Sequence, residues 1–110
     1  MKVLLLMYHD EKALQRMPRE ELGKLPGAFA AYLQSLKDGG VLVGNHGLRP
    51  TAEARTVRKD AVLDGPFAET KEQLAGYFLL EVPDMDAALA WAKRVPTAAY
   101  GAVEARPVWT

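Results

Sequence analysis

The chain has 110 residues, 49% hydrophobic and 25% charged, and 14 basic residues balance 14 acidic ones. This size and composition are typical of one globular domain. The absence of cysteine excludes disulfides and thiolate catalysis, and the neutral charge argues against direct nucleic-acid binding and against an anionic membrane surface. The N-terminal apolar run is too short for a signal peptide, and no stretch reaches membrane-spanning length, which predicts a cytoplasmic protein.

The first half of the chain predicts a strand, a helix and a second strand. A short apolar run followed by charged residues predicts a buried strand over residues 3–8. Apolar residues then recur at steps of three and four, which predicts a helix over residues 18–38. Pro26 lacks a backbone N–H, so we expect a kink there. After a glycine pair that ends the helix, residues 41–44 predict the second strand.

The second half predicts an inserted hairpin before another strand, helix and strand. The expected elements are two short strands over 55–63, a turn over 64–67, a helical turn over 68–73, a strand over 76–82, a helix over 85–95 and a strand over 102–109. Asp84 is a suitable N-cap for the helix. With the hairpin set aside, this order is βαββαβ, which predicts an α+β, ferredoxin-like fold in a single domain over residues 1–110.

The first strand is apolar on both faces. Successive side chains of a strand point to opposite faces, and both sets are apolar here: Val3, Leu5 and Met7 on one face, Leu4, Leu6 and Tyr8 on the other. Helices cover one sheet face in this fold, and soluble monomers avoid a large exposed apolar patch on the other. The pattern therefore predicts a homodimer through the sheet face. The alternative is that the hairpin and the C-terminal residues cover that face within one chain.

The most specific string is Asp-Gly-Pro-Phe at residues 64–67, followed by Ala-Glu-Thr-Lys-Glu. This string resembles the signature of the DGPF group within the YCII-related proteins. The likeness extends over the whole chain, through residues 3–8, 40–43, 76–78 and 103–109. It implies a dimeric α/β-barrel built from a ferredoxin-like unit, and it implies little about activity.

Two functional properties accompany this resemblance. Some members of the family are encoded beside, or fused to, extracytoplasmic-function sigma factors, which implies a link to transcriptional regulation. Other YCII-like branches carry a His–Asp pair with the histidine near the first helix. Residues 18–38 contain no histidine here, which argues against that acid–base mechanism in this chain.

Five residues in and after the turn are candidates for a ligand cleft or for a structural role. Asp64 either stabilises the turn by accepting backbone hydrogen bonds or lines a cleft at a strand end. Gly65 is expected to have an unusual backbone conformation, and Phe67 to anchor in the core. Glu69 and Lys71 either form a solvated face or point into the cleft.

The last strand carries a second candidate cluster. Glu104 and Arg106 are two residues apart on a strand and so share a face. They form either an ion pair at the rim or a site in which Arg106 holds a small anionic ligand. Tyr8, at the end of the first strand, is a further candidate for the cleft. Asp64, Glu104 and Arg106 are the candidates for catalysis, and they would converge at one rim of the sheet.

No cofactor or metal is expected. The two histidines, His9 and His46, lack metal-ligand spacing with their neighbours, and no phosphate- or dinucleotide-binding motif is present. Two functions therefore remain open. One is small-molecule binding or carboxylate acid–base chemistry in a cleft near the Asp64–Phe67 turn. The other is a non-catalytic protein-interaction module linked to sigma-factor-dependent transcription.

Overall fold

The computed structural model describes residues 1–109. Its elements are, in chain order, β1 (Lys2–His9), α1 (Glu11–Gln15), α2 (Arg19–Asp38), β2 (Leu42–Gly47), the 3-10 turn η1 (Thr51–Glu53), β3 (Arg55–Arg58), β4 (Ala61–Asp64), β5 (Gln73–Glu81), α3 (Met85–Ala92), the 3-10 turn η2 (Pro96–Ala99) and β6 (Ala102–Pro107). Residues 1–109 thus form a mixed α+β protein, as the sequence predicts, with three α-helices, of which the sequence analysis predicts α2 and α3. Within residues 1–109, no helix combines the length and the apolar character needed to cross a membrane.

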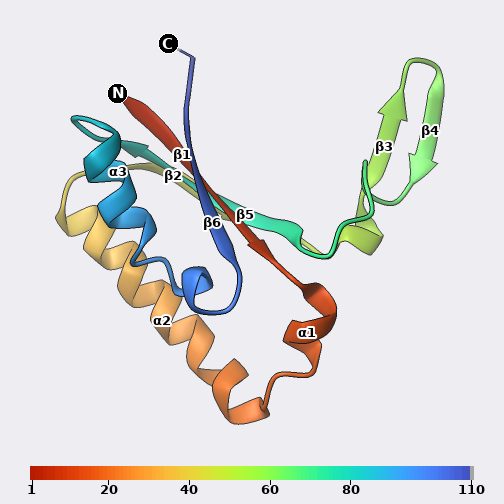
Figure 1. Ribbon diagram of the computed structural model, residues 1–110, viewed down its shortest axis with the longest axis horizontal. Coiled ribbons are helices and arrows are strands. Elements are labelled where there is room, and N and C mark those ends of the chain that lie inside the picture. Colours follow the sequence, from red (N-terminus) through yellow and green to blue (C-terminus); the bar gives the residue numbers. More distant parts are fainter. Residues whose placement is uncertain (110) are drawn as a thin grey trace.

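Four strands form one antiparallel sheet in the order β2-β5-β1-β6, while β3 and β4 pair as a separate hairpin. Strands β1 and β5 are central, in keeping with their nearly continuous apolar sequences. Figure 1 shows α2 and α3 on the same side of this sheet. The sheet therefore has one face covered by helices and one face without them.

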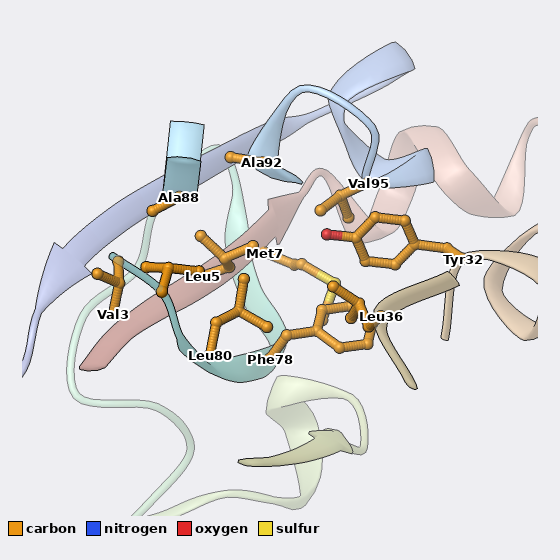
Figure 2. Packing of buried hydrophobic residues seen from close by; sticks show 11 residues of the cluster. Val3, Leu5, Met7, Tyr32, Leu36, Phe78, Leu80, Ala88, Ala92 and Val95 are labelled. Carbon is orange, nitrogen blue, oxygen red and sulfur yellow. The ribbon is translucent and has the colours of Figure 1, made fainter. Parts of the chain in front are cut away.

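The core lies between the sheet and these two helices (Figure 2). Its buried side chains are Val3, Leu5 and Met7 of β1, Phe78 and Leu80 of β5, Tyr32 and Leu36 of α2, Ala88 and Ala92 of α3, and Val82 and Val95. The hydroxyl of Tyr32 donates a hydrogen bond of 2.9 Å to the carbonyl of Trp91. That bond joins α2 to α3 and satisfies the one polar atom that Tyr32 brings into the core.

One local prediction is wrong, and one short helix, α1, is not among the predicted elements. Asp10 begins α1, because its carboxylate accepts hydrogen bonds from the backbone N–H groups of Lys12 and Ala13, at 3.0 and 3.1 Å. The helical turn expected over 68–73 is absent, since these residues are irregular until β5 begins. Helix α2 runs without a break through Pro26.

The hairpin of β3 and β4 forms an arm, which we define as residues 55–67. It projects away from the sheet, green in Figure 1. The chain has a radius of gyration of 15.2 Å, whereas a compact domain of this length has about 13 Å. The inserted hairpin predicted from the sequence is therefore present, but it stands apart from the main body.

Candidate functional site

The sheet face without helices is largely apolar. Cross-strand partners share a face, so the register of β1 with β5 and β6 defines which side chains lie there. These are Leu4, Leu6 and Tyr8 of β1, Tyr77 and Leu79 of β5, and Glu104 and Arg106 of β6. We call this set the open face. All except Arg106 are half-buried, although no helix packs on them.

The arm does not cover the open face. Val57 and Val62, which pair across the hairpin, are 67% and 68% exposed, and Trp109 near the C-terminus is fully exposed. The alternative expectation, that the hairpin and the C-terminal residues cover the face within one chain, is therefore wrong. The reason is that the hairpin pairs with itself as a second sheet and turns away from the first.

Three polar groups meet on the open face. The hydroxyl of Tyr8 donates a hydrogen bond of 3.2 Å to Oε1 of Glu104. Arg106 donates through Nε to Oε2 of the same carboxylate at 2.8 Å, and its terminal NH2 group contacts that oxygen as well. Glu104 thus lies between Tyr8 and Arg106, and both of its oxygens accept hydrogen bonds.

The environment of this cluster changes the acidity of its members. Burial raises the pKa of the Tyr8 hydroxyl, and the hydrogen bond to Glu104 and the charge of that carboxylate raise it further. The same carboxylate, as hydrogen-bond acceptor and as opposite charge, raises the pKa of Arg106. The Arg106 side chain is 63% exposed, so solvent screens the ion pair and its contribution to stability is small.

Tyr8 also lines a cleft with a volume of about 600 Å³. The cleft lies between the end of the open face and the base of the arm. Its walls include Tyr8 and Leu74 from the sheet, and Arg55, Val57, Pro66 and Phe67 from the arm. The site is therefore formed by chain segments that are distant in sequence. Its lining is more apolar than polar, and one tyrosine hydroxyl in it is held by a carboxylate.

The remaining predicted site residues lie elsewhere. Asp64 forms an ion pair with Arg55 across the hairpin, with 3.2 Å between Oδ1 and Nε. Glu69 lines a smaller cleft of about 360 Å³ beside η1, and Lys71 is exposed. Within residues 1–109, neither an ion pair nor a hydrogen bond joins Asp64 to Glu104 or Arg106.

Phe67 is not a core residue. Its side chain is 73% exposed, and the guanidinium of Arg58 lies 4.8 Å from the ring centroid. The expectation of a core anchor is wrong because the arm on which Phe67 lies has no core of its own. The predicted special backbone of Gly65 is confirmed, since its φ is +97°.

A second cleft, of about 310 Å³, was not predicted as a ligand site. Its lining includes His9, Glu11 and Arg49 beside apolar residues. The Glu11 carboxylate accepts a hydrogen bond of 3.1 Å from the backbone N–H of Thr51 and another from its hydroxyl. The sequence feature that could have indicated this cleft is the polar cluster His9-Asp10-Glu11, which directly follows the apolar first strand. In the part of the chain that the structure describes, no group of three or more acidic or histidine side chains gathers as metal ligands.

These features define a small α+β protein with a four-stranded antiparallel sheet, one open sheet face and a cleft at its end. The YCII-related domain model matches residues 1–110, and the chain belongs to that family. An uncharacterised protein of Rhizobium meliloti (strain 1021) is 36% identical over 109 residues, which span 94% of this chain and 88% of that protein.

A solved structure has a similar fold. It is 5-chloro-2-hydroxyhydroquinone dehydrochlorinase of Burkholderia phenoliruptrix in complex with 2,5-dihydroxybenzoquinone, with a TM-score of 0.59 and 15% sequence identity. The match covers 100% of this chain and 94% of that one. At this identity the likeness concerns the fold alone.

Proposed function

We propose that this protein binds a small polar molecule in the cleft at Tyr8. One observation carries the proposal: the cleft of about 600 Å³ has a lining that is more apolar than polar and contains a tyrosine whose hydroxyl is oriented by Glu104. Small-molecule sites have volumes of about 300–1,000 Å³ and combine mostly apolar walls with few, well-placed polar groups. The cleft has both properties.

The chemistry of Tyr8 suggests the kind of ligand. The phenol is protonated at neutral pH, since its pKa lies above the ordinary tyrosine value of 10.0, so Tyr8 acts there as a hydrogen-bonding group rather than as a base. Because its proton is donated to Glu104, the phenol oxygen retains lone pairs that accept a hydrogen bond from a ligand hydroxyl. Arg106 then provides positive charge beside the carboxylate, which favours a ligand that also carries an anionic group.

The similar solved structure supports the choice of probes. That protein is described with 2,5-dihydroxybenzoquinone bound, a planar ring with two hydroxyl groups. Such a molecule has the size and the hydroxyl groups that the Tyr8 cleft suits. If this chain is an enzyme, we infer acid–base chemistry in which the Glu104 carboxylate exchanges a proton with the ligand, while Tyr8 orients that ligand through a hydrogen bond.

We further propose that the chain is a ferredoxin-like unit of the DGPF group that pairs through its open face as a dimeric α/β-barrel. The sheet order β2-β5-β1-β6 supports a ferredoxin-like topology. The apolar side chains of the open face, only half-buried in one chain, support the pairing. Each such side chain buried in the dimer contributes up to about 1.5–3 kcal/mol.

A thermal-shift screen tests the binding function. Wild type, Tyr8→Phe, Arg106→Ala and the control Tyr77→Phe are heated with 2,5-dihydroxybenzoquinone, small aromatic carboxylates and inorganic phosphate. We expect at least one probe to raise the melting temperature of wild type and Tyr77→Phe. The shift should be lost in Tyr8→Phe, and Arg106→Ala should lose it for anionic probes. Since Tyr77 shares the open face but does not line the cleft, it controls for a general loss of a hydroxyl.

The same screen distinguishes ligand binding from the competing function, a protein-interaction module. The exposed apolar side chains of the arm favour a non-catalytic interaction module, which the family resemblance connects with sigma factors. If none of the probes shifts wild type, or if the shift persists in Tyr8→Phe, the proposed site is wrong and the interaction module becomes the better explanation.

A further inference from the structure

We propose that the arm, residues 55–67, is a dimerisation element that packs against a second copy of this chain. This inference rests on the proposed homodimer and adds a contact that the open face does not include. In its own chain, the arm has no second layer of structure packed against it, because β3 and β4 form a separate sheet of only two strands.

The chain exposes more surface to solvent than a compact monomer of its mass. The chain exposes 7662 Å², whereas a compact monomer of 12.1 kDa exposes about 6,000 Å². The excess is about 1,600 Å², and one partner in a standard stable interface buries about 800 Å². A second copy that covers the open face and the arm therefore has enough surface to form a stable dimer.

The arm carries an unusual density of exposed apolar side chains. The four are Val57, Val62, Leu63 and Phe67. They occupy both faces of the hairpin, because Val57 pairs with Val62 whereas Leu63 pairs with Thr56. An isolated two-stranded hairpin is only marginally stable in water. Contact with another surface would bury these side chains and hold the hairpin in one conformation.

The position of the arm favours a second copy as that surface. The base of the arm and the end of the open face line the same cleft, through Val57 and Phe67 on one side and Tyr8 and Leu74 on the other. The apolar surface thus continues from the sheet onto the arm. When two open faces pack about a two-fold axis, each arm stands beside the partner's sheet, and the same interface buries both surfaces.

Sedimentation equilibrium on two double variants of the full chain tests this inference. Val62→Glu/Leu63→Glu places one charge on each face of the hairpin. Leu89→Glu/Ala90→Glu is the control, because it adds the same charges at exposed positions of α3, and Leu89 is 43% exposed against 48% for Leu63. We expect the arm variant to raise the dimer dissociation constant at least about tenfold, and the control to change it by less than about twofold.

The outcomes separate the arm from the rest of the proposal. A dimer with an unchanged dissociation constant in the arm variant overturns the arm inference and leaves the sheet dimer and the cleft intact. A wild-type chain that remains monomeric at high micromolar concentration overturns the arm inference and the homodimer together. Ligand binding in the cleft is then still decided by the thermal-shift screen.

A second measurement covers the case in which the charged arm variant misfolds. Because the chain has no cysteine, Val62→Cys accepts a single environment-sensitive fluorophore such as bimane. We expect its emission to move to shorter wavelength as the protein concentration rises through the range of dimerisation. The same label on Ala90→Cys should show no change. Emission from the arm label that is independent of concentration contradicts the inference.

Discussion

Tyr8 is the residue that joins the open face, the cleft and the polar cluster. It lies at the end of β1, it lines the cleft beneath the arm, and its hydroxyl reaches Glu104 on β6, 96 residues away in sequence. Burial and the neighbouring carboxylate both favour the protonated phenol, which is why its pKa is raised. The protonation of this one group therefore affects the stability of the folded chain.

Alkaline titration tests the environment of Tyr8. Above pH 10 an unfolded chain ionises its tyrosines, whereas folded Tyr8 retains its proton, so the free energy of unfolding falls as the pH rises past that value. Tyr8→Phe removes this contribution, and its stability should fall less steeply as the pH rises above 10. Urea unfolding followed by circular dichroism at each pH measures the slope.

Glu104→Gln separates the effect of the neighbouring charge on the Tyr8 pKa from the effect of burial. It removes the charge that raises the Tyr8 pKa but leaves the burial, so its slope should lie between those of wild type and Tyr8→Phe. Equal slopes for wild type and Tyr8→Phe would show that Tyr8 is solvated like a tyrosine of the unfolded chain.

The turn between β4 and β5 shows how one element is built from its own sequence. Gly65 has φ of +97°, a backbone region that residues with a side chain rarely adopt. Its N–H donates to the carbonyl of Ala54 at 2.8 Å, and its carbonyl accepts a bond of 2.9 Å from the Thr56 hydroxyl. These bonds close the base of the arm. Asp64 takes no part in them and pairs with Arg55 instead.

The junction between η2 and β6 depends on Gly101. A Cβ at this position would lie 2.1 Å from the backbone oxygen of Tyr8, so Gly101→Ala must move β6 away from the end of β1. We expect a loss of at least about 2 kcal/mol in the free energy of unfolding, measured by urea titration. Gly23→Ala is the control, because Gly23 lies in α2 with no neighbour within 4 Å. That change should stabilise the chain by up to about 1 kcal/mol.

The Gly101 variant also bears on the candidate site. A displaced β6 separates Glu104 from Tyr8, so the probe-induced thermal shift should weaken together with stability. A Gly101→Ala chain as stable as wild type would mean that the close approach of the two backbones is not maintained in solution.

The whole molecule is organised by the contrast between the two faces of its sheet. One face packs on α2 and α3 around Leu5 and Leu80. The other exposes a comparable set of apolar side chains without a covering layer. A domain is stable when each apolar surface meets another one, and in this protein the second surface is expected from another copy.

Leu4→Asp tests the proposed association at the level of the assembly. Leu4 lies on the open face between Leu79 of β5 and Arg106 of β6. A charge buried there should raise the dimer dissociation constant by at least about 100-fold, measured by light scattering across a dilution series. Leu89→Asp, on α3, should leave association unchanged. A Leu4→Asp chain that is folded and as dimeric as wild type rules out the open face as the interface.

Properties that depend on neighbouring residues can be predicted from the order of residues alone. The unbroken apolar run of residues 3–8 predicted β1 and its two apolar faces, and residues 55–63 predicted the hairpin. Asp84 was recognised as the N-cap of α3, where it accepts a bond of 2.8 Å from the N–H of Ala87. Gly65 was assigned a special backbone from the Gly-Pro turn. In each case the cause is local steric or hydrogen-bonding chemistry, which the order of residues contains.

Contacts between distant segments of the chain, in contrast, follow from the fold and cannot be predicted from local patterns. The register of β1 with β6 places Tyr8 and Arg106 around Glu104. Because β3 and β4 pair only with each other, Asp64 forms an ion pair with Arg55. The predicted convergence of Asp64 with Glu104 required the arm to fold back on the sheet, but the arm projects outward. Strand pairing and the direction of a hairpin depend on contacts between segments far apart in the chain, and short-range patterns carry no information about those contacts.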